Sequence, residues 1–289
     1  MRTRRVGGVV AALVLLLGGA ACGDAPAPAP VVVPPVVVAP AAPVIYPVGL
    51  RVLHLHRGSN RPLPTLVFYP AVPGGRFPLV LFCHGLSGSA ERYARTLAGW
   101  AAAGFVVAAP TFPYTSEFTD DFRRPDIVNQ PADARFVLRR VAALNQRGGD
   151  PLRHRMDTEH MAAIGHSAGG YTTTGLFTAG HDPRLKAGII MAGWGAKGAF
   201  AGPPATMLFL QGKADPIVPV ASSRRLFLRV PWPKSYVLMR RDSHATYLKP
   251  GDIGYDAMNS LVIDFLRWTL DGDLAARNGL PPMVYPQLR

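Results

Sequence analysis

The sequence predicts one α/β domain with a mostly parallel central sheet, helices on both faces and no large cap domain. From about residue 49, short apolar segments alternate with segments of helical spacing, as expected for strands joined by crossover helices. Several of the apolar segments are uninterrupted, which is typical of strands buried on both faces. The chain has 289 residues, 48% hydrophobic and 17% charged, and neither an internal repeat nor a second linker divides it.

In the first half, residues 50–55 and 64–69 alternate in the manner of half-buried strands, and residues 77–82 form a buried one. Residues 91–103 have helical spacing, and Gly104 suits the C-terminal cap of that helix. A further apolar strand at 105–109 precedes Pro110. The next helix is expected at 131–145, where apolar residues recur at helical spacing.

In the second half, strands are expected at 161–164, 187–191, 207–210 and 235–239. Helices are expected at 167–178, 221–230 and 255–270, each following a strand. This repeated alternation extends the parallel sheet, so residues 49–289 are assigned to a single catalytic domain.

An export signal is expected at the N-terminus. Residues 1–21 combine early arginines, a short apolar run and small residues, which is the pattern of a signal peptide. Cys22 follows in a context that resembles a bacterial lipoprotein cleavage site, although Gly19 replaces the usual large aliphatic residue. A lipid anchor at Cys22 is therefore expected, with free secretion as the alternative. Residues 22–48, rich in Ala, Pro and Val, should form an extended linker.

Composition limits the partners. The formal net charge is +13, but the basic residues are scattered and no nucleic-acid-binding motif is present, so a nucleic-acid partner is not expected. With only two cysteines, Cys22 and Cys83, a disulfide framework is also not expected. We expect a monomer that uses no metal and no cofactor, with its only membrane contact through the lipid anchor.

Ser167 is the candidate nucleophile. Residues 165–169 read Gly-His-Ser-Ala-Gly and fit G-x-S-x-G between a predicted strand and a predicted helix, which is the context this motif requires. A sharp strand-to-helix turn lifts the hydroxyl above the sheet edge, and the new helix directs its first amides at developing negative charge.

A serine nucleophile needs a base and an acid that orients the base, and in α/β-hydrolases these follow in the order Ser, Asp or Glu, His. His244 is the only histidine after residue 181. Asp215 follows the strand at 207–210 and is the candidate acid; its alternative role is to cap the helix near residue 220. Asp242 competes for the same function but lies two residues before His244.

The oxyanion hole should use two backbone amides. One is that of Ala168, directly after the nucleophile; the other comes from the loop after the third strand, where Leu86 follows Gly85. His84 precedes both and is out of order for a catalytic base, so it should shape the loop.

Together these residues resemble a known group of enzymes. Residues 78–110, 165–170, 212–219 and Ser243-His244 are similar to bacterial cutinase-like and polyester-degrading lipases, to platelet-activating-factor acetylhydrolases and to chlorophyllase-type esterases, over residues 49–275. The resemblance implies an α/β-hydrolase fold and a serine esterase without a metal. Leu86, His166 and Ala168 replace the aromatic residues or methionine usual in polyester-degrading members, and their C-terminal disulfide is absent, which argues against a polyester substrate.

The substrate is expected to be a small-molecule or lipid ester. Trp194 should lie near the catalytic edge, as a wall of the acyl pocket or as a core residue. The loop at 111–129 carries four aromatic residues that either contact an acyl chain or pin the loop. Two alternative functions are a serine peptidase of the prolyl-peptidase type, which usually has an added domain, and an inactive surface-binding protein, which would lack a triad member.

Overall fold

Eight strands form one sheet with the order β1-β2-β4-β3-β5-β6-β7-β8. In the computed structural model, residues 44–285 are described; the predicted signal peptide, Cys22 and residues 22–43 of the predicted linker lie outside the described residues. The strands are β1 (Val48–His56), β2 (Pro62–Pro70), β3 (Phe77–Cys83), β4 (Val106–Pro110), β5 (Met156–His166), β6 (Leu185–Met191), β7 (Thr206–Gly212) and β8 (Lys234–Met239).

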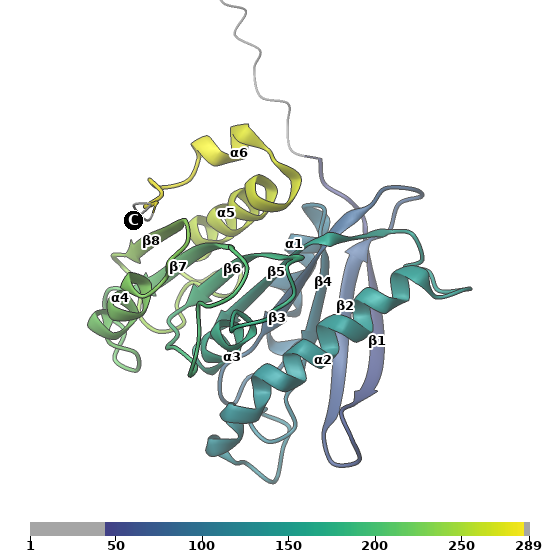
Figure 1. The fold of residues 1–289 in the computed structure, drawn as a ribbon, viewed down its shortest axis with the longest axis horizontal. Coiled ribbons are helices and arrows are strands. Elements are labelled where there is room, and N and C mark those ends of the chain that lie inside the picture. Colours follow the sequence, from purple (N-terminus) through teal and green to yellow (C-terminus); the bar gives the residue numbers. More distant parts are fainter. Residues whose placement is uncertain (1–43, 286–289) are drawn as a thin grey trace, which may run out of the picture. The chain divides into compact units, whose positions relative to one another are not determined.

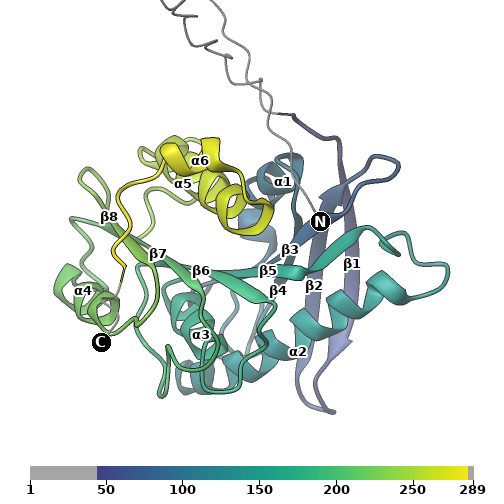
Figure 2. The same ribbon diagram turned by 45° about the horizontal axis from the view of Figure 1, so that its top comes forward.

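Helices cover both faces of this sheet. The α-helices are α1 (Ala94–Ala102), α2 (Gln130–Ala142), α3 (Ala168–Leu176), α4 (Val220–Leu228), α5 (Tyr255–Leu266) and α6 (Leu274–Asn278). Figures 1 and 2 show α1, α5 and α6 on one face and α2, α3 and α4 on the other. Each face has its own buried apolar cluster, and α2, α3 and α4 contribute to one while α1 and α5 contribute to the other.

The strand directions confirm the predicted sheet. β2 runs antiparallel to β1 and β4, and all pairs from β4 to β8 are parallel. The carboxyl ends of the parallel strands therefore meet at one edge, which is where loops carry functional residues in such sheets. No helix in residues 44–285 has the length and apolar character needed to cross a membrane.

Element boundaries differ from the sequence prediction where local signals are weak. The strand expected at 161–164 begins earlier, at Met156, because Met156 and Asp157 pair with Phe77 and Pro78 at the end of the sheet. The helix expected at 91–103 starts as a 3₁₀ turn, η1 (Glu91–Tyr93), and continues as α1. Its C-cap residue is Ala103, and Gly104 follows with a φ of 108°, which agrees with the glycine expected at the end of this helix.

Four short elements were not predicted. One is the helix α6 (Leu274–Asn278), which follows α5 in the chain. The other three adjoin predicted helices. The loop at 111–129 contains a 3₁₀ helix, η2 (Arg124–Asn129); α2 ends in another, η3 (Ala143–Gln146); and the helix expected at 255–270 ends at Leu266 and continues as a π-helical turn, η4 (Arg267–Asp271). All three lie at helix ends, where tertiary contacts rather than periodicity set the hydrogen-bond pattern.

Candidate active site

Ser167 occupies a tight turn between β5 and α3. Its φ of 57° and ψ of −119° lie outside the regions that L-residues ordinarily adopt. The flanking glycines make this turn sterically accessible: a Cβ on Gly165 would lie 2.0 Å from the Gly169 carbonyl oxygen, and one on Gly169 would lie 1.9 Å from that of Cys83. The G-x-S-x-G sequence is therefore required here by close backbone contacts, and the strain it holds is of the kind found at functional sites.

The Ser167–Ala168 and Gly85–Leu86 peptide groups are held in place by hydrogen bonds to their carbonyl oxygens. The Ser167 carbonyl accepts from the amides of Gly170 (2.9 Å) and Tyr171 (3.2 Å), and the Gly85 carbonyl accepts from the Gly88 amide (3.2 Å). In a trans peptide the N–H points opposite to the C=O. The amides of Ala168 and Leu86 are thus turned away from these bonds, and within residues 44–285 neither donates a hydrogen bond to the protein.

The loop that carries Leu86 lies against the nucleophile. A Cβ on Gly85 would be 3.1 Å from the Ser167 Cβ, so only a glycine allows this contact without displacement. The loop after β3, which carries the Leu86 amide, therefore lies beside the turn between Ser167 and Ala168. Two unpaired amides beside a hydroxyl are the arrangement that stabilises a tetrahedral oxyanion.

His84 fixes the shape of this loop. Its Nδ1 donates to the Gly85 carbonyl (2.7 Å), and its Nε2 accepts from the Phe112 amide (3.0 Å). Burial lowers the pKa of His84 to about 4, so the ring is neutral at ordinary pH and keeps one donor and one acceptor. Both ring nitrogens are used, as expected for a structural rather than a catalytic histidine.

Asp215 and His244 meet at the same edge of the sheet. His244 Nδ1 lies 2.8 Å from Asp215 Oδ2, although the residues come from loops after different strands, β8 and β7. Gly212 allows this approach, because a Cβ there would lie 2.0 Å from the Ser243 carbonyl oxygen. A buried carboxylate on Nδ1 sets the tautomer in which Nε2 can accept a proton.

The carboxylate of Asp215 is held ionised. Burial alone would raise its pKa, but the hydrogen bond from His244 and those from the amides of Val218 and Ile217 (2.8 Å each) outweigh burial and lower the pKa. Asp215 does not cap α4, whose N-cap residue is Pro219. The competing Asp242 accepts from the Thr246 hydroxyl (3.0 Å) and has no bond to His244.

His166 joins the nucleophile turn to the loop of His244. Its Nε2 lies 2.8 Å from the His244 carbonyl oxygen and must donate to it, and the two rings are 4.7 Å apart between centroids. Burial, with the nearby His244, lowers the pKa of His166 to about 3, so this donor stays neutral. No hydrogen bond within residues 44–285 joins the Ser167 hydroxyl to the His244 ring; in unliganded sites such bonds often close only around substrate.

Cys83 is not an alternative nucleophile. It is fully buried at the end of β3, and this burial raises its pKa to about 12. The thiolate required for attack is therefore scarce at neutral pH.

An open cleft of about 360 Å³ lies beside Tyr171, which is one helical turn after Ser167 in α3. Its wall includes Trp194, which is partly buried, and Tyr171, whose ring centroid lies 6.0 Å from that of Trp194. The 111–129 loop supplies the opposite wall through Arg124, Pro125, Ile127 and Val128. Of the four aromatic residues of this loop, Phe112 is fully buried, whereas Phe118 and Phe122 are 64% and 47% exposed.

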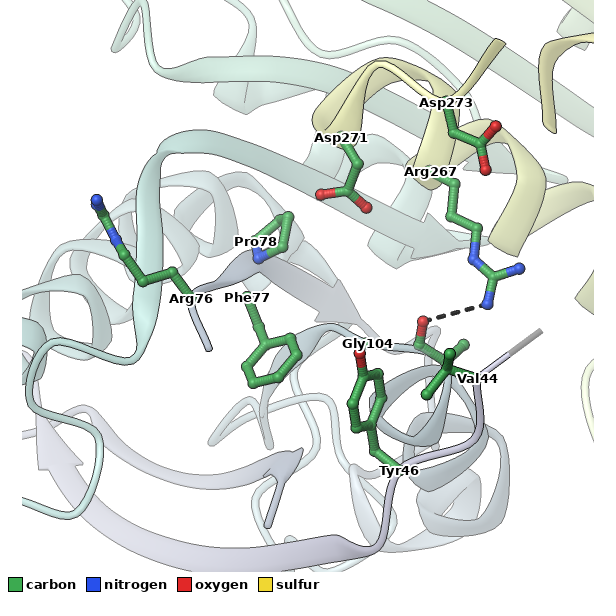
Figure 3. A pocket seen from close by; sticks show the side chains of 10 residues that line it. Val44, Tyr46, Arg76, Phe77, Pro78, Gly104, Arg267, Asp271 and Asp273 are labelled. Carbon is green, nitrogen blue, oxygen red and sulfur yellow. Dashed lines mark hydrogen bonds between the residues drawn. The ribbon is translucent and has the colours of Figure 1, made fainter. Parts of the chain in front are cut away.

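A second cavity, of about 400 Å³, lies at the opposite edge of the sheet (Figure 3). It is lined by residues at the amino end of β3, such as Phe77 and Pro78, together with Gly104, Arg267 and Asp271. The sheet separates this cavity from Ser167, His244 and Asp215, so it does not belong to the candidate active site.

Sequence reasoning missed His166 and Gln211. Gln211 donates to Asp215 Oδ2 (2.8 Å) and to the Val218 carbonyl (3.0 Å), and these bonds fix the Asp215 carboxylate in addition to its bond with His244. Its place at the end of β7, four residues before Asp215, is the only sequence signal, and a buried polar residue there is easily read as part of the turn.

One comparison with known proteins gives a family match. A family model described as PET hydrolase-like matches residues 64–278, a range that contains most of β2, the strands β3 to β8, and the positions of Ser167, Asp215 and His244. A search of curated proteins found no match.

Proposed function

The chain belongs to the PET hydrolase-like family, an α/β-hydrolase family of polyester- and cutinase-like esterases, and on this premise we propose that it is an extracytoplasmic serine hydrolase. It cleaves carboxylic esters through an acyl-enzyme intermediate, with Ser167 as nucleophile, His244 as base and Asp215 as the acid that orients His244. The observation that carries the proposal is the strained turn of Ser167 at the sheet edge where Asp215 bonds to His244 Nδ1.

The reaction follows from these roles. Ser167 Oγ attacks the ester carbonyl carbon while His244 Nε2 takes the hydroxyl proton. The tetrahedral oxygen accepts hydrogen bonds from the amides of Leu86 and Ala168. Collapse of this intermediate expels the alcohol, which takes the proton from His244. Water then attacks the acyl carbon as His244 Nε2 accepts its proton. The bond between the acyl carbon and Ser167 Oγ breaks, His244 returns the proton to Ser167 Oγ, and the carboxylic acid leaves.

The cleft lined by Tyr171 and Trp194 is the proposed binding place of the substrate. Its apolar and aromatic walls suit the acyl or alcohol part of a small-molecule or lipid ester. The Thr174 hydroxyl fixes the backbone around Trp194, because it accepts from the Ala196 amide (2.9 Å) and donates to the Trp194 carbonyl (3.4 Å). A rigid aromatic wall favours a defined substrate orientation near Ser167.

The proposed location is outside the cytoplasm. Residues 1–21 act as the export signal, and Cys22 is the site of lipid attachment; the protein is a monomer and needs no cofactor. Replacing Cys22 with serine should move the protein from the membrane fraction to the soluble fraction. Unchanged fractionation would contradict the lipid anchor.

Hydrolysis of p-nitrophenyl esters from acetate to palmitate tests the chemistry. The purified chain should release p-nitrophenolate, and Ser167→Ala should abolish turnover while the cooperative unfolding transition remains. Turnover that survives in Ser167→Ala would rule out the proposed nucleophile. The chain length with the highest kcat/KM would report the depth of the cleft.

A further inference from the structure

We propose that Gln130 is a positioning residue of the oxyanion hole. Its side-chain amide lies between the segment that supports the Leu86 amide and the helix that begins with Ala168. This inference rests on the proposed function, since it concerns how the two donor amides are kept in register. Gln130 is the first residue of α2 and touches neither Ser167 nor His244 through any hydrogen bond of residues 44–285.

The amide of Gln130 bonds to two threonines. Its Nε2 lies 2.6 Å from Thr115 Oγ1, and its Oε1 lies 2.7 Å from Thr172 Oγ1. All three side chains are buried, with at most 1% of any residue exposed. Because each hydroxyl can donate or accept, the bridge is satisfied whichever way the amide is turned. A buried, fully paired amide of this kind resists displacement, since breaking it would leave polar groups without partners.

Thr115 connects the bridge to the Leu86 side. Its carbonyl accepts from the amide of Ser87 (2.8 Å), the residue directly after Leu86, and the adjoining Glu117 amide donates to the Gly88 carbonyl (3.1 Å). Ser87 has a φ of 52°, an unfavourable value for a residue with a side chain. The loop therefore depends on these outside bonds to keep its shape.

Thr172 connects the bridge to the Ala168 side. It lies one helical turn after Ala168, and its hydroxyl is 3.0 Å from the Ala168 carbonyl oxygen. With Gln130 Oε1 toward Thr172, the hydroxyl proton is shared between this oxygen and the Ala168 carbonyl. Gln130 thus links the first turn of α3, which presents one oxyanion amide, to the segment that holds the other.

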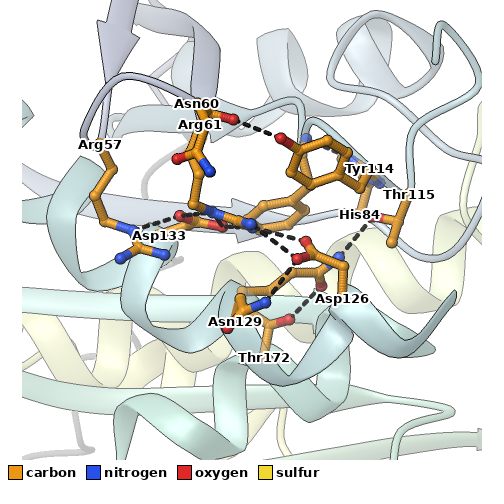
Figure 4. A network of polar contacts seen from close by, with 12 residues as sticks. Arg57, Asn60, Arg61, His84, Tyr114, Thr115, Asp126, Asn129, Asp133 and Thr172 are labelled. Atoms are coloured by element: carbon orange, nitrogen blue, oxygen red, sulfur yellow. Dashed lines mark hydrogen bonds and ion pairs between the residues drawn. The ribbon is translucent and has the colours of Figure 1, made fainter. Parts of the chain in front are cut away.

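A buried ion cluster anchors the position of Gln130. Arg61 bonds to both oxygens of Asp126 (2.8 and 2.7 Å) and to Asp133, on either side of Gln130 in sequence. Figure 4 shows Arg61 with these two aspartates, and Thr115 and Thr172 close to the cluster. The start of α2 is therefore a fixed support, from which a side chain can hold two other segments in place.

The consequence for catalysis concerns the transition state. Oxyanion donors act at about 2.7–3.1 Å from the developing charge, so a displacement of either amide by a fraction of an ångström weakens stabilisation. The uncharged carbonyl of bound substrate gains less from the same bonds. Loss of the bridge should therefore lower kcat and leave KM largely unchanged.

Gln130→Met tests this directly, since methionine matches the length of glutamine but makes neither bond. The matched control is Asn145→Leu: Asn145 is another buried amide with two bonds, to the Met156 carbonyl (2.9 Å) and amide (3.0 Å), at the amino end of β5. Both variants should lose thermal stability. Only Gln130→Met should also lose kcat on p-nitrophenyl butyrate, by about tenfold, with KM within about twofold.

Thr172 supplies an independent test if Gln130→Met does not fold. Thr172→Val keeps the shape and loses the hydroxyl, so it should lower kcat, and Thr172→Ser should restore it. In the double variant with Gln130→Met, kcat should stay within about twofold of Gln130→Met alone, because both changes break one bridge.

Other results would overturn the inference. If Gln130→Met keeps the parent kcat, or Asn145→Leu loses as much, the bridge only stabilises the fold. If Thr172→Val retains full kcat, the link to Ala168 is wrong. Failure of the proposed function is distinguishable, because the unmodified chain would then show no hydrolysis dependent on Ser167.

Discussion

Replacement of Asp215 by asparagine is the most specific single substitution for testing the proposed triad. Asp215 Oδ1 accepts from the amides of Ile217 and Val218, and Oδ2 accepts from Gln211 and His244, all at 2.8 Å. Asparagine can keep the two backbone bonds with its oxygen. Its NH₂ group then takes the place of Oδ2 and faces Gln211 Nε2 and His244 Nδ1, both of which donate hydrogen bonds in the parent.

The two donors respond differently. Gln211 can rotate its amide, because its Oε1 is buried without a partner and can accept from the new NH₂ group. His244 can relieve the conflict only by moving its ring proton from Nδ1 to Nε2. The Nε2 nitrogen then carries a proton and cannot accept one from Ser167.

The expected loss in kcat is about 10⁴-fold, or about 5 kcal/mol of transition-state stabilisation, as for other triads with the wrong tautomer. The unfolding free energy should change by only about 1 kcal/mol, because all four bonds to the side chain can be kept or remade, and the bond lost is that from Gln211 to the Val218 carbonyl when the Gln211 amide rotates. Steady-state kinetics on p-nitrophenyl butyrate and urea unfolding of the same preparation measure the two quantities.

Asp242→Asn is the control for this prediction. Asp242 is buried in the same loop as His244 but bonds to Thr246, so its amide variant should retain kcat within about tenfold of the parent. A larger kcat loss in Asp242→Asn than in Asp215→Asn would refute the assignment of the acid.

Three further predictions follow from the packing and charges. Gly169→Ala should prevent folding, because its Cβ would lie 1.9 Å from a backbone oxygen, whereas Gly148→Ala, with no atom within 4 Å, should be within about 0.5 kcal/mol of the parent in urea unfolding. Arg61→Met should lower the unfolding free energy by about 3–5 kcal/mol, because it leaves the buried Asp126 without an arginine and the buried Asp133 with Arg57 alone. Burial lowers the pKa of His84 from 6.5 to about 4, so as the pH falls the unfolded chain binds a proton at this residue before the folded chain does. The unfolding free energy should therefore drop by up to about 3 kcal/mol between pH 6.5 and pH 4. The drop should be smaller in His84→Ala.

Each of these has a contrary outcome. A folded Gly169→Ala would show that the turn at Ser167 can open. An Arg61→Met protein as stable as the parent would mean that the ion cluster is replaceable by apolar packing. An equal fall in stability for His84→Ala on acidification would assign the pH dependence to other groups.

The fold was predictable where the chain carries strong local signals. Uninterrupted apolar runs identified β3, β4 and β7, and Gly104 marked the end of α1 because only a residue that tolerates φ 108° fits there. The start of β5 was missed, because residues 157–160 are polar and resemble a loop in sequence; of these four, only Asp157 pairs with β3.

The candidate site was predictable to the extent that it follows chain order. G-x-S-x-G and the single late histidine predict Ser167 and His244 as members of the triad, and the structure contains a hydrogen bond between Asp215 and His244. The contacts of Gln130 with Thr115 and Thr172 span 15 and 42 residues and leave no periodic pattern. Such pairings depend on how distant loops meet, which sequence spacing does not record.

The most direct test of the proposed mechanism is intact-protein mass spectrometry after reaction with a fluorophosphonate ester, followed by peptide mapping. We predict one adduct, on Ser167, absent in Ser167→Ala and formed much more slowly in Asp215→Asn. An unmodified folded protein, or an adduct on any other residue, would contradict the assignment of Ser167 as the nucleophile.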